Sequence, residues 1–224
     1  MLQFTQMNKK LLFYVLFFIV LVAAFQFYVF KGTGMWSKST LPKRSTVNHF
    51  EFLNQDGTVF TNNEMKGKVC VVNYFFTTCP GICPKMNNNM KLIYEAFKNE
   101  PDFLIVSNTC NPSTDSVPVI KHYADSLQVD TKKWIFLTGR KDSLYKMARY
   151  SYGIDDPKHT VANIEDDFIH TQFFALIDKN GNVRGGVYDG LKKDELEKLK
   201  KDISSLLKEK QGEGNFANGA FTNN

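Results

Sequence analysis

The sequence contains little cysteine, and the signatures of several common enzyme classes are absent from it. Four cysteines in 224 residues are too few for a disulfide scaffold, so they do not by themselves fix the redox compartment. No glycine-rich phosphate loop, no Ser, His and Asp order of a hydrolase and no paired acidic motif occurs. The sequence therefore gives no support to a nucleotide-dependent or hydrolytic enzyme.

The sequence also has no strong excess of charge of one sign. The net charge is +5, and residues 192–210 mix acidic and basic side chains in the manner of a solvated helix face. No basic block with interleaved aromatic residues is present, and no internal repeat is visible. We expect no nucleic-acid partner and no repeat architecture.

One long apolar run lies near the N-terminus. Residues 11–30 contain no charged side chain, and Gln26 is the one strongly polar residue among them. A helix of this length spans about 30 Å at about 1.5 Å per residue, which is the thickness of a bilayer core. The run predicts a transmembrane signal anchor after a short cytoplasmic tail at residues 1–10. A cleaved signal peptide is the less favoured alternative, because the small residues at 22–24 lie inside the run.

Charge does not decide the orientation of this anchor, because basic residues flank the run on both sides. We place the N-terminus in the cytoplasm, since a long domain can be translocated despite such flanking charge. No Arg-rich, Ser-rich presequence precedes the run, which favours a bacterial membrane over a mitochondrial one. The prediction is a single-pass protein of the bacterial inner membrane with its main domain on the periplasmic side.

Composition divides the rest of the chain into three segments. Residues 31–46 contain glycine, serine and proline without a sustained apolar period, which predicts a tether. Residues 47–210 have an ordinary length for one core and are predicted to form a single domain. Residues 211–224 are rich in glycine and asparagine, which predicts a disordered tail.

The central feature of the domain is a loop with two thiols. Residues 69–76 form an apolar run rich in β-branched and aromatic side chains, which predicts a strand buried on both faces. The loop TTCPGICP follows at residues 77–84, and Pro84 suits the first position of a helix. A helical spacing then continues through Met86, Met90, Ile93 and Phe97. The loop should therefore lie at the carboxyl end of a strand, where open α/β sheets bind ligands.

The two thiols of this loop are Cys79 and Cys83, with three residues between them. The thioredoxin redox motif has two residues at that place, so it is not matched. Cys83 falls at a helix N-terminus, where the thiolate is favoured, and two converging thiolates suit Cu(I) or zinc. A structural disulfide and inert buried thiols are the alternatives. Pro80 and Gly81 between the cysteines favour an exposed turn instead.

The remaining pattern alternates strands with helices and predicts an α/β domain with a mixed central sheet, of thioredoxin-like fold. A hairpin with Asp56-Gly57 at its turn is expected first. Asp115 is a candidate N-cap for the second helix. The expected elements are a hairpin at 49–60, strands at 103–107 and 134–137, helices at 116–127, 143–152 and 192–208, and a hairpin at 171–188.

Three motifs together resemble the Sco/SenC family. They are TCPGICP at 78–84, NPSTDS at 111–116, and His170-Thr171 opening a strand, and the resemblance covers about residues 50–207. It implies a membrane-anchored, thioredoxin-like protein that binds copper and assists assembly of the dinuclear copper centre of cytochrome c oxidase. The implied partners are the copper-receiving subunit of that oxidase, a copper donor and thiol-disulfide partners.

The resemblance places copper ligands at Cys79, Cys83 and His170. This set agrees with copper chemistry, because two thiolates hold Cu(I) and an added imidazole lets the site accept Cu(II). Two departures from the family pattern remove negative charge near the expected site. Asn111 stands where the family usually has aspartate, and Ile169 stands where it usually has an acid before the histidine.

The other two cysteines are expected to play different parts. Cys70 begins one strand and Cys110 follows another, so parallel neighbours would place them at opposite edges of the sheet, too far apart for a disulfide. Cys70 is predicted to be a core residue. Cys110 lies nearer the functional edge, where an extra contacting thiol is an alternative to a buried one. Met86 and Met90 are predicted to pack in the core, and the histidines at 49, 122 and 159 to be surface or packing residues.

Three functions are compatible with these residues. The first is a copper metallochaperone, which need not be an enzyme. The second is a thiol-disulfide reductase that keeps partner cysteines reduced through Cys79 and Cys83, and the third is a copper or redox sensor. A general thiol oxidoreductase is disfavoured, because this chain has Thr171 where thioredoxin-type enzymes typically have a cis-proline. His170 distinguishes the first two functions, since dithiol exchange does not require it.

Overall fold

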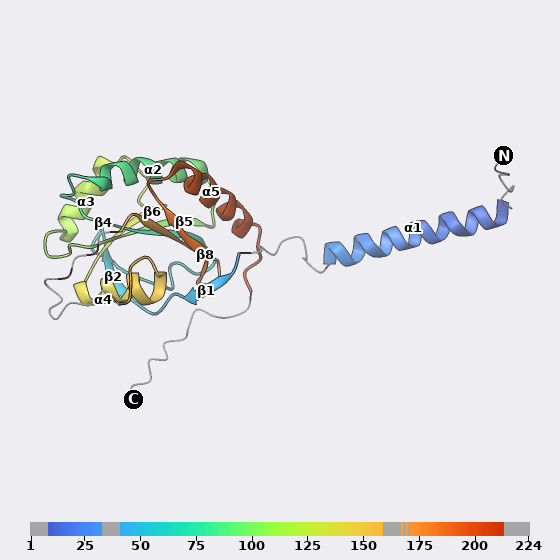
Figure 1. Cartoon of the computed structure of the whole chain (residues 1–224), viewed down its shortest axis with the longest axis horizontal. Helices are drawn as coiled ribbons and strands as arrows, with labels where there is room; N and C mark the ends of the chain where they lie inside the picture. The colour runs from blue at the N-terminus through green and yellow to red at the C-terminus, as the bar shows by residue number, and fades with distance from the viewer. Residues whose placement is uncertain (1–8, 33–40, 159–166, 168, 170, 213–224) are drawn as a thin grey trace, which may run out of the picture. The chain divides into compact units, whose positions relative to one another are not determined.

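The computed structural model describes residues 9–32, 41–158, 167, 169 and 171–212. The chain divides into two compact units, residues 1–38 and 39–224. The first contains helix α1 (Lys9–Gly32), of which Lys10–Tyr28 is long and apolar enough to cross a membrane (Figure 1). The large apolar side chains between Leu11 and Tyr28 are exposed rather than packed in a protein core.

The second unit is built on one mixed sheet of eight strands in the order β1-β8-β7-β4-β5-β6-β2-β3. The central strands β4, β5 and β6 run parallel, and every other pairing is antiparallel. The strands are β1 (Lys43–Thr46), β2 (Glu51–Asn54), β3 (Val59–Thr61), β4 (Val69–Phe75), β5 (Phe103–Thr109), β6 (Trp134–Thr138), β7 (Phe173–Ile177) and β8 (Asn182–Asp189). The predicted α/β domain with a mixed central sheet is confirmed.

Helices cover both faces of this sheet. Figure 1 shows α2 (Ile82–Phe97), α3 (Val117–Ser126) and α5 (Lys193–Leu207) on one face and α4 (Lys141–Lys146) on the other. A helical segment η1 (Met147–Tyr152) continues α4. Because β4 and β5 are parallel neighbours, their carboxyl ends lie at the same edge of the sheet, which is where the thiol loop begins.

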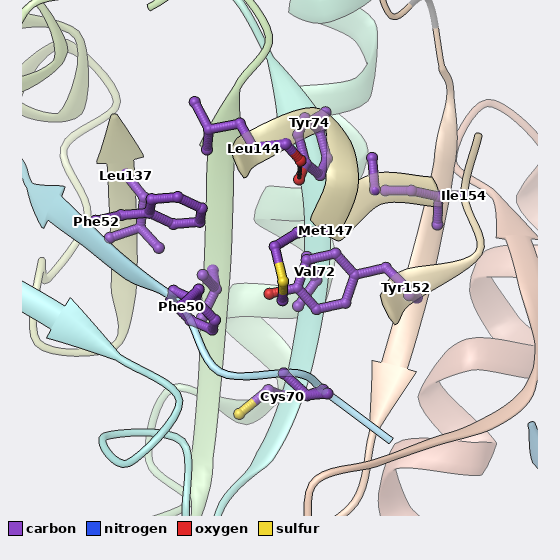
Figure 2. Packing of buried hydrophobic residues seen from close by; sticks show 14 of the residues in the cluster. Phe50, Phe52, Cys70, Val72, Tyr74, Leu137, Leu144, Met147, Tyr152 and Ile154 are labelled. Atoms are coloured by element: carbon purple, nitrogen blue, oxygen red, sulfur yellow. Dashed lines mark hydrogen bonds between the residues drawn. The ribbon is translucent and has the colours of Figure 1, made fainter. Parts of the chain in front are cut away.

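Strand β4 is buried on both faces, as its apolar run predicts. Val69, Val71 and Phe75 join the core cluster that contains the apolar side chains of α2 and α5. The alternate residues Cys70, Val72 and Tyr74 join the opposite cluster, with Leu144, Met147 and Tyr152 of the α4 side (Figure 2). Each large apolar side chain buried in this way stabilises the fold by about 1.5–3 kcal/mol.

The expected tether is wrong for its last four residues. Lys43–Thr46 form β1, an edge strand that pairs with β8 in antiparallel register. The sequence KRST has no apolar alternation, so its strand conformation comes from the hydrogen bonds offered by β8 rather than from a pattern of its own. All of the expected tail beyond Gly212 lies outside the described residues, and Gly212 donates its N–H to Asn180 Oδ1 at 2.9 Å.

A π-helical turn replaces the second half of the helix predicted at 143–152. The α-helix ends at Lys146, and the π segment η1 runs to Tyr152. Gly153 ends it in the left-handed region at φ 64°, as expected for a glycine after a helix. Such π segments are rare and occur frequently at functional sites.

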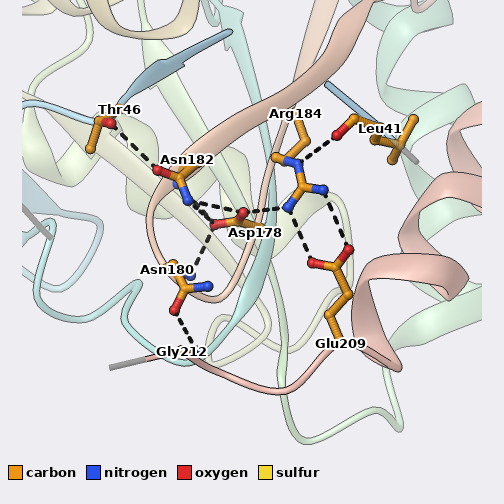
Figure 3. Close-up of polar contacts among 8 residues, drawn as sticks. All are labelled: Leu41, Thr46, Asp178, Asn180, Asn182, Arg184, Glu209 and Gly212. Carbon is orange, nitrogen blue, oxygen red and sulfur yellow. Dashed lines mark hydrogen bonds and ion pairs between the residues drawn. The ribbon is translucent and has the colours of Figure 1, made fainter. Parts of the chain in front are cut away.

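A polar cluster around the turn between β7 and β8 lies near the start of β4, away from the thiol loop (Figure 3). Arg184 Nη1 lies 2.7 Å from Asp178 Oδ2 and 3.1 Å from Glu209 Oε2. Arg184 Nε donates to the carbonyl of Leu41 at 3.0 Å, so the cluster joins the start of the domain to its last helix. Arg184 is thus a partly buried arginine with two acidic partners, at the end of the sheet away from the thiol loop.

Candidate metal site

A cavity of about 280 Å³ opens at the carboxyl end of β4. Three of its lining residues are the thiols Cys79, Cys83 and Cys110. The rest are largely apolar, and the full set is Tyr74, Phe75, Phe76, Cys79, Pro80, Gly81, Ile82, Cys83, Cys110, Ile169 and Thr171. Two of the three cysteines come from the thiol loop, and the third follows the neighbouring strand β5.

The loop geometry follows from the end of β4 and the start of α2. The Cys79 N–H donates to the carbonyl of Phe76 at 3.3 Å, which turns the chain back after the strand. Helix α2 begins at Ile82, two residues before Pro84, so Cys83 sits in the first turn. Cys79 is half-buried and Cys83 is buried. The predicted placement of Cys83 at a helix N-terminus is confirmed.

The two loop thiols differ in acidity. Burial acts to raise the pKa of Cys79, but hydrogen bonds from the Cys83 thiol and from the N–H groups of Cys83, Gly81 and Ile82 outweigh it and lower the pKa. Burial raises the pKa of Cys83 to about 12, and its hydrogen bond to Cys79 acts in the same direction. Cys79 is therefore the more acidic thiol of the pair, and the Cys83 thiol donates a hydrogen bond to it.

Cys110 lies in the cavity wall but faces the loop from another side. Its thiol donates to the carbonyl of Phe75 at 3.3 Å, and burial raises its pKa. The N–H of the next residue, Phe76, donates to the sulfur of Cys83. The C=O and N–H of one trans peptide point in opposite directions, so the two sulfurs approach that peptide from opposite sides. Within the part of the chain that the structure describes, no three His, Cys, Asp or Glu residues are placed to hold a metal together.

His170, the third predicted ligand, lies outside the described residues. Its two sequence neighbours, Ile169 and Thr171, are described, and both line the thiol cavity. Ile169 is buried and adds apolar surface where an acid would have added charge. Thr171 Oγ1 donates to the carbonyl of Ile154 at 2.9 Å, and no cis peptide occurs among the described residues.

Asp115 has a role that the sequence interpretation missed. It does not cap α3, whose N-cap is Ser116. Its buried carboxyl group instead accepts hydrogen bonds from the hydroxyls of Thr77 and Thr109, each at 2.5 Å, and from the Thr77 N–H at 3.3 Å. Asp115 thus ties the thiol loop to the end of β5. The sequence did contain a signal for this role. Thr77 follows β4, Thr109 ends the neighbouring parallel strand β5, and the acid Asp115 lies in the loop after β5.

The remaining predicted side chains are largely where they were expected. Cys70 is fully buried in the core, and all four cysteines are free. Met86 and Met90 pack in the core beneath α2, so their predicted role is confirmed. His49 and His122 are exposed, and His159 lies outside the described residues. Asn111 anchors its own loop through its N–H, which donates to Thr109 Oγ1 at 2.9 Å.

Comparison with known proteins gives consistent matches over the second unit. A family model described as SCO1/SenC matches residues 38–208. An SCO2-like protein of Rickettsia felis is 33% identical over 168 residues, which cover 71% of this chain and 74% of the relative.

Solved structures match the same region. BsSco, a member of the Sco family of cytochrome c oxidase assembly proteins in which a disulfide switch was identified, has a TM-score of 0.63 at 29% identity, over 75% of this chain and 97% of that chain. ScoI of Bradyrhizobium japonicum with copper bound has a TM-score of 0.56 at 20% identity, over 72% of this chain and 99% of that chain. These likenesses confirm the predicted thioredoxin-like fold.

Proposed function

We propose that this chain, which belongs to the SCO1/SenC family, is a copper metallochaperone that holds copper through Cys79, Cys83 and His170. One observation carries the proposal. The two thiols of the loop line one cavity, and both sequence neighbours of His170 lie in the wall of that cavity. The cargo would be delivered to the dinuclear copper centre of cytochrome c oxidase during its assembly.

The donor set fits copper on chemical grounds. Thiolates are soft ligands that select Cu(I), and the largely apolar lining of the cavity limits access of water. Cys79 is the more acidic thiol and would bind first. Cys83 must give up its proton to become the second ligand, so copper uptake should release a proton from the site.

Relatives with these properties support the choice of cargo and recipient. ScoI of Bradyrhizobium japonicum has been solved with copper bound. BsSco belongs to a family of cytochrome c oxidase assembly proteins. The copper-receiving subunit of the oxidase is accordingly the proposed partner, and a copper donor and thiol-disulfide partners are proposed beside it.

We also propose that α1 anchors the domain in the bacterial inner membrane. Residues 11–30 would span the bilayer, residues 1–10 would lie in the cytoplasm, and residues 31–42 would tether a periplasmic domain. The support is the apolar stretch Lys10–Tyr28, whose length matches a bilayer core. The full chain should stay in the membrane fraction after alkaline washing, and release by that wash would contradict the anchor.

A thiol-disulfide reductase is the second candidate function. The lowered pKa of Cys79 beside the Cys83 thiol is the observation that favours it, since a nucleophilic thiolate with a neighbouring thiol is what disulfide exchange requires. The disulfide switch identified in BsSco gives further support. The same dithiol could serve both functions, so an experiment must address His170.

Changing His170 to alanine should separate the two functions. Two thiolates hold Cu(I) at low coordination number, so His170→Ala should retain Cu(I). Cu(II) prefers more ligands and readily accepts imidazole, so its affinity should fall by at least about tenfold and its absorption spectrum should change. Titration of each oxidation state with the purified protein measures both effects.

The matched control is His122→Ala, which removes an exposed histidine on α3 and should leave both titrations unchanged. Exchange with a small disulfide should stay close to the wild-type rate in both variants, because the dithiol is intact. If His170→Ala bound Cu(II) with unchanged affinity and spectrum, His170 would not be a ligand. The reductase function would then be the better supported one.

A further inference from the structure

A buried arginine joins the π segment η1 to two aspartates. Arg149 is 8% exposed. Its Nε lies 2.7 Å from Asp155 Oδ2. Its Nη2 donates to Asp167 Oδ1 at 2.9 Å, and its Nη1 lies 2.7 Å from Asp167 Oδ2. The guanidinium group therefore contacts both oxygens of one carboxylate and one oxygen of the other.

Such an arrangement is weak as a source of stability. Removing an arginine and a carboxylate from water carries a desolvation penalty that can equal the attraction between them, and an apolar replacement is often no less stable. What a bidentate pair adds is fixed geometry, because the planar guanidinium matches the two carboxylate oxygens. The Arg149 pair with Asp167 thus fixes where the chain returns after residues 156–166.

A tyrosine continues this connection to the thiol cavity. The hydroxyl of Tyr145 donates to the carbonyl of Cys110 at 2.7 Å and accepts the N–H of Ile169 at 3.4 Å. The same hydroxyl lies 3.3 Å from the carbonyl of Asp167. The Arg149 guanidinium carbon stands 5.6 Å from the centre of the Tyr145 ring. The two side chains together hold Asp167 and Ile169 against Cys110, the residue that follows β5.

The held residues form one side of the cavity. Ile169 and Thr171 both line it, two and four positions after Asp167. Thr171 is fixed in addition through its hydroxyl, which donates to the carbonyl of Ile154 just beyond η1. The hydrogen bonds described above for Asp167, Ile169 and Thr171 thus lead back to the segment 145–155, and Arg149 carries the contacts with both aspartates.

We propose that Arg149 is a positioning residue for the metal site. By fixing Asp155 and Asp167 it sets the place of Ile169 and Thr171 relative to the two loop thiols, and so the geometry available to a ligand on that side. This inference rests on the proposed copper function, and it assigns to η1 the task of positioning Ile169 and Thr171, the sequence neighbours of the proposed ligand His170, without touching the metal.

The structure offers a matched control for testing this role. Arg184 is a second partly buried arginine with two acidic partners, at the other end of β4 (Figure 3). Lysine keeps the positive charge at either position but cannot contact two carboxylates through a planar fork. Arg149→Lys and Arg184→Lys should therefore each disturb an arginine with two acidic partners. Only the network of Arg149 adjoins the thiol cavity.

We expect both variants to fold, and one of them to alter the site. Arg149→Lys should bind Cu(II) about 10-fold to 100-fold more weakly and with a changed absorption spectrum, as is typical when an outer-shell partner is lost. Its Cu(I) uptake by the dithiol should be retained. Arg184→Lys should match the wild-type spectrum. Tyr145→Phe removes the hydroxyl alone and should shift the Cu(II) spectrum in the same direction as Arg149→Lys, by a smaller amount.

A metal-free measurement keeps this inference separate from the proposed function. Amide hydrogen exchange should show loss of protection at Ile169 in Arg149→Lys and unchanged protection in Arg184→Lys. Unchanged protection and an unchanged Cu(II) spectrum in Arg149→Lys would overturn the inference, as would equal changes in both lysine variants. Should the wild-type protein bind no copper while Ile169 still loses protection, the proposed function would fail and the positioning role of Arg149 would stand.

Discussion

Replacing Cys79 and Cys83 together with serine should abolish stoichiometric Cu(I) binding and leave the domain folded. The reduced wild-type protein is expected to take up about one Cu(I), because two soft thiolates on one loop suffice for a low-coordinate site. Serine oxygen is a poor ligand for Cu(I), and it occupies nearly the same space as the sulfur it replaces. The copper-to-protein ratio after anaerobic removal of free metal measures the effect, and circular dichroism checks the fold.

Cys70→Ala is the matched control for this experiment. Cys70 is fully buried in the core and is the second residue of β4, at the end of that strand away from the loop. The variant should lose some stability because a small cavity forms, yet retain about one Cu(I). Stoichiometric Cu(I) in the double serine variant would place the site elsewhere, and Cys110 in the cavity wall would be the first residue to test.

The parts of the fold that local sequence determines were predictable. The apolar run at 69–76 indicated the buried strand β4, because a strand covered on both faces contains few polar residues. Asp56-Gly57 indicated the turn between β2 and β3, and Gly57 has the positive φ of 76° that such a turn requires. The thiol loop was predictable in the same way, because its prolines restrict the backbone and its glycine permits a tight turn wherever they occur.

Features that depend on distant partners were not predictable. Strand β1 has no apolar alternation, and it exists because β8 offers unpaired backbone groups beside it. Arg149 reads as an exposed helix residue until the fold brings Asp167 to it. Asp115 has the sequence position of a helix cap, yet its carboxyl group bonds to threonines on two neighbouring strand ends. Secondary-structure propensity depends on the few residues that flank a position in the sequence. Each of these features depends instead on contacts with residues farther along the chain, which local propensity does not describe.

The thiol loop itself should respond to a change at Asp115. Asp115→Ala would leave three donors without their acceptor, namely the Thr77 hydroxyl, the Thr77 N–H and the Thr109 hydroxyl. Each buried donor left unpaired costs about 1–3 kcal/mol, and hydroxyl rotation recovers part of it, so the free energy of unfolding should fall by about 2–4 kcal/mol. Urea denaturation followed by circular dichroism measures this change.

Two comparisons make the Asp115 result specific to the loop. Asp142→Ala removes an exposed acid that pairs with the exposed Arg140, and it should change the free energy of unfolding by less than about 0.5 kcal/mol. Asp115→Asn keeps one carbonyl acceptor of similar shape and should fall between the alanine variant and the wild type. Because Thr77 lies two residues before Cys79, Asp115→Ala should also weaken Cu(I) binding, whereas Asp142→Ala should not. Equal stabilities for the two alanine variants would show that Asp115 does not hold the loop to the end of β5.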